Sequence, residues 1–220
     1  MVSVLFIGNS HTYYHEMPQM LVRLAEAGNP HSTIAVEQST ASGVSLEWHW
    51  RNQPTRDLIA RGDWDAVVLQ ERSGGPLEDE EAMHEYARRF HEEISEWGAE
   101  TVFYMTWART YQPGTQPEIA TAYTEIADEL HATLAPVGAA WKRALERDSD
   151  LRLHAPDGRH ADPPGSYLAA CVFYALFCDA DPTGLPGKIS VEGKTVVDLP
   201  NDRASFLQTV AHETVKEYGS

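Results

Sequence analysis

Three side chains in this sequence have the chemical types of a nucleophilic catalyst. Ser10 supplies a hydroxyl, and Asp157 and His160 supply a carboxylate and an imidazole only three residues apart. A serine hydroxyl is a weak nucleophile at neutral pH, so it needs a nearby base and a group that orients that base. Imidazole is suited to be the base, and a carboxylate can hold it in the required tautomer. The residue types therefore predict a Ser-His-Asp arrangement.

Each part also has a simpler interpretation when it is taken alone. Ser10 follows a short apolar run and could be a helix N-cap. The pair Asp157-Gly158 is typical of a turn. The catalytic interpretation therefore depends on a fold that brings these distant segments together.

Apolar segments that alternate with helical patterns predict such a fold. We expect strands at Ser3–Ile7, Thr33–Glu37, Ala66–Leu69 and Thr101–Thr106, and a weaker one near Leu151–His154. Helical patterns lie between and after them, at Met17–Ala27, Thr55–Arg61, Glu78–Trp97, Pro117–Leu134, Ala139–Arg147, Ser166–Phe177 and Ala204–Tyr218. This alternation predicts an α/β protein: a three-layer α/β/α sandwich around a central parallel sheet of about five strands. We expect one domain over residues 1–220, with a small extended excursion near 187–199 and a C-terminal helix near 204–218.

The carboxyl ends of parallel strands lie at one edge of a sheet, which is where open α/β sheets bind ligands. One chemically useful residue follows each predicted strand: Ser10, Gly43, Gln70, Trp107 and His160. The topology therefore predicts that the nucleophile and the base are neighbours.

Ester or amide chemistry also needs donors for the negative charge that develops on the carbonyl oxygen. The candidates are the backbone N–H groups of Ser10 and Gly43 and the side-chain amide of Gln70. Gln70 could instead be a strand-end amide that bonds to loop backbone. Trp107 is a candidate substrate contact, and with Trp48, His49 and Trp50 it could form an apolar or sugar-stacking wall. Packing in the core is the alternative for each of them.

Several segments resemble the SGNH (GDSL-type) hydrolases. The resemblance is carried by Gly8-Asn9-Ser10, by Gly43 and by Asp157-Gly158-Arg159-His160, which are similar to the first, second and last sequence blocks of that family. Three further segments, at 68–73, 104–109 and 165–171, look like a bacterial subgroup of largely unassigned substrate. The combination of the first and last blocks is the specific part.

The resemblance implies a three-layer fold, with Ser10 as the nucleophile, His160 as the base and Asp157 as the residue that orients it. The sequence departs from the family pattern at two places. Asn9 stands where aspartate is common, and Leu69-Gln70-Glu71 stands where the family usually has Gly-x-Asn-Asp. Gln70 would then replace the asparagine donor with a longer amide.

Composition narrows the choice of partners. The net charge of −16 argues against nucleic acid and anionic membranes, because both require cationic surfaces. The most apolar stretch, Tyr167–Cys178, is shorter than the roughly 20 residues of a membrane span. The N-terminus lacks the basic and long apolar regions of a signal peptide, so we expect a cytoplasmic protein.

These observations predict a serine esterase for small O-acyl groups, including acetyl esters on a carbohydrate. Its partner would be a small-molecule or carbohydrate ester, and we expect neither a metal nor an organic cofactor. A lipase or thioesterase for longer acyl chains is one alternative. A non-catalytic binding protein on the same scaffold is another, and the altered Gln70 block motivates it. The oligomeric state is not predicted.

Overall fold

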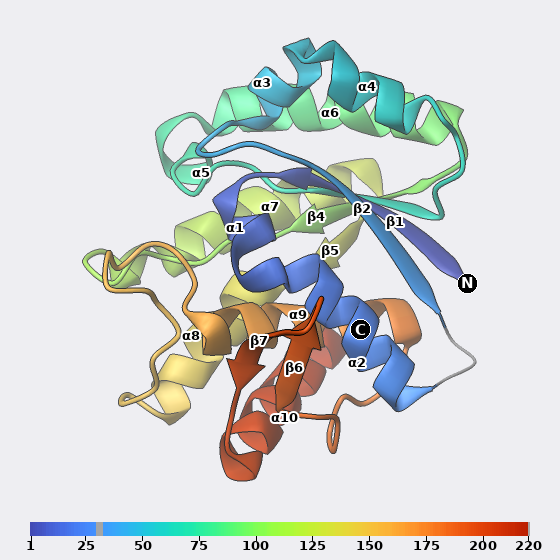
Figure 1. The fold of residues 1–220 in the computed structure, drawn as a ribbon. Coiled ribbons are helices and arrows are strands. Elements are labelled where there is room, and N and C mark those ends of the chain that lie inside the picture. Colours follow the sequence, from blue (N-terminus) through green and yellow to red (C-terminus); the bar gives the residue numbers. More distant parts are fainter. Residues whose placement is uncertain (30–32, 220) are drawn as a thin grey trace.

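A central parallel sheet organises the molecule. The computed structural model describes residues 1–29 and 33–219, and within them five parallel strands lie in the order β2-β1-β3-β4-β5 (Figure 1). These strands are β1 (Val2–Gly8), β2 (Ile34–Thr40), β3 (Ala66–Leu69), β4 (Glu100–Tyr104) and β5 (Thr133–Ala135). The apolar runs of β1 and β3 are buried on both faces, as the central strands of a parallel sheet must be.

Helices cover both faces of the sheet. One face packs against α2 (Met17–Gly28), α8 (Val137–Arg147), α9 (Pro163–Cys178) and α10 (Asn201–Tyr218). The other packs against α3 (Leu46–Arg51), α4 (Gln53–Ile59), α6 (Glu80–Glu96) and α7 (Gln116–Leu130). Neighbouring residues of β1 alternate between the two cores, with Phe6 in the first and Ile7 in the second. The three-layer α/β/α sandwich predicted from the sequence is confirmed (Figure 1).

The apolar helix α9 is buried along most of its length, from Gly165 to Ala175. It packs against the sheet and against its helical neighbours α2 and α10. These contacts on several sides explain why the residues of α9 are apolar on all of its faces. In the part of the chain that the structure describes, no helix combines the length and the hydropathy needed to cross a bilayer.

The prediction for the fifth strand was wrong. Leu151 and Leu153 are buried and alternate with polar residues, as in a strand, but this segment forms only an isolated bridge between His154 and Ala161. The fifth strand is β5, which the sequence pattern assigned to the end of a helix. Helix α7 ends earlier, because His131 adopts a left-handed conformation (φ 50°) and turns the chain back toward β4. His160 therefore lies in the long connection between α8 and α9 rather than after a strand.

The segment near 187–199 is an antiparallel hairpin of β6 (Lys188–Val191) and β7 (Lys194–Asp198). Its two-residue turn, Glu192-Gly193, has positive φ at both positions, as tight hairpin turns require. Apolar residues of both strands join the core on the side of α9. Short helical turns complete the structure: α1 (Ser10–Tyr13), η1 (Tyr14–Glu16), α5 (Gly75–Glu78) and η2 (Pro113–Thr115).

Candidate active site

Ser10 lies at the carboxyl end of β1, on the sharp turn into α1. The Asn9 side chain caps this helix by accepting a hydrogen bond from the His11 N–H (3.1 Å). As the first residue of α1, Ser10 has a backbone N–H without an acceptor inside the helix. Gly8 is required by close packing, since a Cβ there would lie 2.5 Å from Thr12 Oγ1 and 2.6 Å from Gln70 Oε1.

The structure brings the three sequence-predicted residues together. Ser10 Oγ lies 2.9 Å from His160 Nε2, and His160 Nδ1 lies 2.5 Å from Asp157 Oδ2. The other oxygen of Asp157 accepts hydrogen bonds from the backbone N–H groups of Arg159 (2.9 Å) and His160 (3.0 Å). The hydroxyl, the imidazole and the carboxylate thus form a continuous hydrogen-bonded relay, in the geometry of a nucleophile, its base and the base's orienting group.

A compact turn holds this relay in place. The Gly158 N–H donates to the Ala155 carbonyl (2.9 Å), and the Ala155 N–H donates to the His160 carbonyl (2.8 Å). Gly158 has φ +69°, a left-handed conformation that favours glycine. The Tyr14 ring stacks on the His160 imidazole with centroids 4.6 Å apart. The orientation of the imidazole is therefore fixed by backbone, carboxylate and aromatic contacts.

The Asp157 carboxyl group has a lowered pKa, which is what a partner of the His160 imidazole needs. Desolvation opposes ionisation, but hydrogen bonds from the His160 ring and from the Arg159 and His160 N–H groups outweigh it. Together they hold the pKa of Asp157 well below its ordinary value. The carboxylate thus stays ionised at neutral pH and can support a positive charge on the imidazole.

His11 forms the wall behind the relay, a position that the sequence did not indicate. Its ring lies between the rings of Trp107 (4.7 Å) and His160 (5.5 Å). Burial, followed by the nearby charges of His160, Arg159 and Arg109, lowers the pKa of His11 to about 3. This second imidazole is therefore neutral and does not compete as a base.

A small cavity of ≈130 Å³ opens beside Ser10 at the carboxyl edge of the sheet. It is lined by Asn9, Ser10, His11, Ser42, Gly43, Arg72, Ser73, Gly74, Arg109, Arg159 and His160. Gly43 has φ +68°, and no atom lies within 4 Å of the position that its Cβ would take. The adjacent Val44 carbonyl accepts a hydrogen bond from Asn9 Nδ2 (3.0 Å), which ties the Gly43 loop to the Ser10 turn. The cavity is thus lined by both residues whose backbone N–H groups are expected to face an oxyanion.

The structure does not place Gln70 as expected. This residue is fully buried beneath the Ser10 turn and does not line the cavity. Its Oε1 accepts hydrogen bonds from the Asn9 N–H and the Thr12 hydroxyl, both at 2.9 Å, and its Nε2 donates to the Glu71 carbonyl. Its amide is thus used to brace the turn that carries the nucleophile, which matches the strand-end alternative and not the oxyanion donor.

Trp107 also differs from the expectation of a substrate contact. It is almost completely buried and stacks on Trp141 with ring centroids 4.0 Å apart. Its Nε1 donates to the Arg159 carbonyl (3.0 Å), so it anchors the turn formed by residues 155–160. Trp48 is exposed next to Ser45, while His49 is buried and bonds to the Gly8 carbonyl. The expected aromatic wall is therefore not assembled around Ser10.

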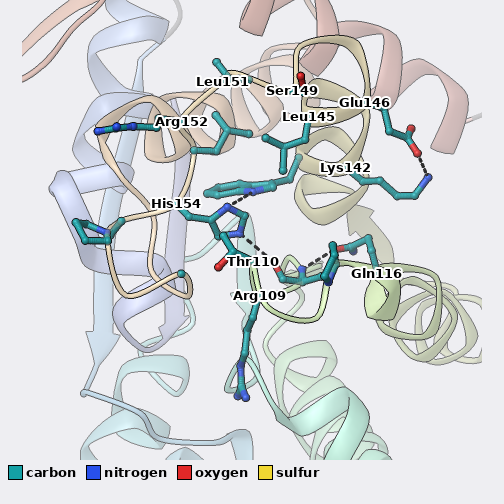
Figure 2. Close-up of a pocket in the computed structure, with 17 residues that line it drawn as sticks. Arg109, Thr110, Gln116, Lys142, Leu145, Glu146, Ser149, Leu151, Arg152 and His154 are labelled. Atoms are coloured by element: carbon teal, nitrogen blue, oxygen red, sulfur yellow. Dashed lines mark hydrogen bonds and ion pairs between the residues drawn. The ribbon is translucent and has the colours of Figure 1, made fainter.

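A larger cavity of ≈550 Å³ lies between α8 and the segment that follows it, and Figure 2 shows its lining residues. Its lining includes Leu145, His154 and Gly158 but neither Ser10 nor His160. Arg109 lines both cavities, and Figure 2 shows its side chain directed away from Leu145 and Lys142. The 155–160 turn thus separates the large cavity from the reacting groups.

The sequence matches no family model and no curated protein. Solved structures do resemble it. A protein from Slackia heliotrinireducens that is assigned to the SGNH hydrolases aligns with a TM-score of 0.68 and 28% identity, over 79% of this chain and 97% of its own. The fold of this chain is therefore similar to that of the SGNH hydrolases. A DUF4886 family protein from Bacteroides uniformis aligns with a TM-score of 0.78 and 20% identity, over 98% of this chain and 95% of its own.

A third neighbour shares the fold at lower identity. It is a variant of an acetyl-xylooligosaccharide esterase from Geobacillus, with a TM-score of 0.65 and 18% identity over 78% of this chain and 92% of its own. The similarity to these solved structures therefore confirms the SGNH-like fold that was inferred from the sequence blocks.

Proposed function

We propose that this chain is a serine hydrolase that cleaves carboxylic esters of small acyl groups through an acyl-enzyme. The observation that carries the proposal is the continuous relay from Ser10 Oγ through His160 to Asp157, at 2.9 and 2.5 Å. A protein that only bound its ligand would not need this relay. The presence of the complete relay therefore favours catalysis over the non-catalytic alternative.

The reaction would proceed in two halves. Ser10 Oγ attacks the ester carbonyl carbon while His160 Nε2 takes the hydroxyl proton, and the carbonyl oxygen becomes an oxyanion. The N–H groups of Ser10 and Gly43 would stabilise this oxygen. His160 then gives its proton to the departing alcohol, which leaves an acyl group on Ser10. Water, deprotonated by His160, then attacks that acyl group; the bond from the acyl carbon to Ser10 Oγ breaks, His160 returns the proton to Ser10 Oγ, and the acid is released.

The size of the cavity supports a short acyl group. A space of ≈130 Å³ beside Ser10 suits a chain of a few carbon atoms, and this favours a small-acyl esterase over a lipase or a thioesterase for long chains. An acetyl ester of a carbohydrate is one such substrate, and one structural neighbour is described as an acetyl-xylooligosaccharide esterase. The alcohol part would lie toward the open side of the cavity.

A series of 4-nitrophenyl esters tests this proposal. We expect kcat/KM to be highest for the acetyl to butyryl esters and to fall at least tenfold by the octanoyl ester. Ser10→Ala should lower kcat by about 10³-fold or more, because the acyl-enzyme cannot form. A rate that rises with acyl length would contradict the small-acyl assignment, and full activity of Ser10→Ala would contradict the mechanism.

A further inference from the structure

The charge of the small cavity is opposite to that of the whole chain. The sequence has 33 acidic residues against 17 Lys and Arg, and its net charge is −16. Yet three arginines, Arg72, Arg109 and Arg159, line the cavity beside Ser10, and among the described residues that line it there is no Asp or Glu. They come from three separate segments, which the fold brings to one place.

Two of these arginines are only partly neutralised. Arg72 Nη1 lies 2.6 Å from Glu78 Oε2, and Arg109 Nη2 lies 3.7 Å from the other oxygen of the same carboxylate. The half-exposed carboxylate of Glu78 thus forms ion pairs with two guanidinium groups. Glu71, which lies 3.9 Å from Arg72, is buried, and burial raises its pKa to about 7. It is therefore partly protonated at neutral pH and supplies less than a full negative charge.

The third arginine is held by its backbone and keeps its charged group exposed. The Arg159 N–H donates to Asp157 Oδ1 (2.9 Å), and its carbonyl accepts from Trp107 Nε1 (3.0 Å). Within residues 1–29 and 33–219, its guanidinium makes no ion pair. Since Arg159 lines the same cavity as Ser10 and His160 and its charge acts on His11, this cation lies close to the triad residues.

The ring of His11 also belongs to this site. It is buried and lines the cavity beside the arginines. Burial and the nearby charges of His160, Arg159 and Arg109 lower its pKa to about 3, so the ring is neutral. The only cations that line the cavity without a neutralising acidic residue among them are therefore the three arginines, within the part of the chain that the structure describes.

We propose that this cavity recognises a carboxylate, so that the preferred substrates are esters with a carboxylate a few bonds from the scissile carbonyl. Arg72, Arg109 and Arg159 would hold it, because guanidinium groups match carboxylates in shape and in hydrogen-bond geometry. The inference rests on the proposed esterase function and adds its substrate class. It also gives a role to a cluster of arginines beside the serine of an acidic protein.

Two matched pairs of esters test it. In one pair the acyl part differs: 4-nitrophenyl hemisuccinate against 4-nitrophenyl methyl succinate. In the other the alcohol part differs: 4-acetoxybenzoate against its methyl ester. Each kcat/KM is divided by the rate of alkaline hydrolysis of the same ester, which removes intrinsic reactivity. We expect the anionic member to be preferred at least tenfold in one pair, and the preference to fall when ionic strength is raised.

Variants connect the preference to the residues. Arg159→Gln and Arg109→Gln should each lower the anionic-to-neutral ratio severalfold. Arg88→Gln removes the same charge from an exposed ion pair on α6 and should leave the ratio unchanged. Equal cleavage of both members in both pairs would overturn the carboxylate proposal while the esterase function stood. Absence of any cleavage would overturn the proposed function, and this inference with it.

Discussion

At the residue scale, the relay depends on an ionised Asp157. This carboxylate accepts three hydrogen bonds, one from the His160 ring and two from backbone N–H groups. They hold its pKa well below its ordinary value, although desolvation opposes ionisation. Asp157 therefore fixes the imidazole tautomer in which Nε2 is free to take the Ser10 proton.

Replacing this carboxylate should mainly affect the chemical step. We expect Asp157→Asn to lower kcat by about 10³–10⁴-fold with a small change in KM, because an amide favours the wrong imidazole tautomer. Steady-state kinetics on 4-nitrophenyl acetate measures this. Asp150→Asn, an exposed site upstream of the same turn, is the matched control. A loss below tenfold in Asp157→Asn would contradict the assigned role.

The raised pKa of the buried Glu71 carboxyl group leads us to expect that the stability of the protein depends on pH. Its folded-state pKa is raised to about 7, chiefly by burial, whereas an unfolded glutamate titrates near 4.5. Between these values the folded state binds more protons, so the free energy of unfolding falls as pH rises. We expect Glu71→Gln to stabilise the protein by about 1–3 kcal/mol at pH 8 and by much less at pH 4.5. Urea unfolding at both pH values measures it, and equal effects at both would contradict the raised pKa.

At the element scale, strand ends could be predicted from the sequence better than side-chain directions. The buried runs before Ser10 and Gln70 identified β1 and β3, and hence the edge where the site lies. Which way Gln70 and Trp107 point could not be predicted, because it depends on partners from other segments, such as the Asn9 N–H and the Arg159 carbonyl. The same holds for the cavity arginines, which come together only in the folded chain.

The boundaries between helices and strands were also difficult to predict from the sequence. Strand β5 has only three residues and follows directly from α7, so periodicity assigns it to the helix. The segment around Leu153 alternates like a strand, but its buried side chains pack against the core without joining the sheet. The sequence pattern placed His160 at the sheet edge because it follows this predicted strand, and that reason was wrong: the connection between α8 and α9 brings His160 to Ser10 instead.

The connection that carries His160 is anchored by Trp107. We expect Trp107→Phe to lower kcat about tenfold, because the lost hydrogen bond to the Arg159 carbonyl lets the turn shift, while KM changes less than about twofold. Trp64→Phe is a matched control, since Trp64 Nε1 likewise donates to a backbone carbonyl (2.7 Å), far from the site. A large rise in KM with unchanged kcat would restore the interpretation of Trp107 as a substrate contact.

At the scale of the whole molecule, the site depends on two cores that hold the sheet between helical layers. Phe173 on α9 contacts Phe6 of β1 and Tyr104 of β4, with ring centroids 5.2 and 5.0 Å away. The Tyr104 hydroxyl donates in turn to the His11 carbonyl (3.1 Å), next to the nucleophile. Packing deep in one layer is thus connected to the turn at the sheet edge.

Truncation in this core should lower global stability. We expect Phe173→Ala to reduce the free energy of unfolding by about 3–5 kcal/mol, because it leaves a cavity under the central strands. Phe206→Ala, at a partly buried site on α10, should cost clearly less. Urea denaturation followed by tryptophan fluorescence measures both. A loss below about 1 kcal/mol for Phe173→Ala would contradict the described packing.

Covalent labelling by a fluorophosphonate tests the central claim most directly, since this probe reacts with a serine activated by its own base. Intact-mass spectrometry should show one adduct per wild-type chain and one per Ser205→Ala chain, where the replaced serine is exposed on α10. The Ser10→Ala variant should show none. A wild-type chain that stays unlabelled, or a Ser10→Ala chain that is labelled as fast as the wild type, would contradict the account.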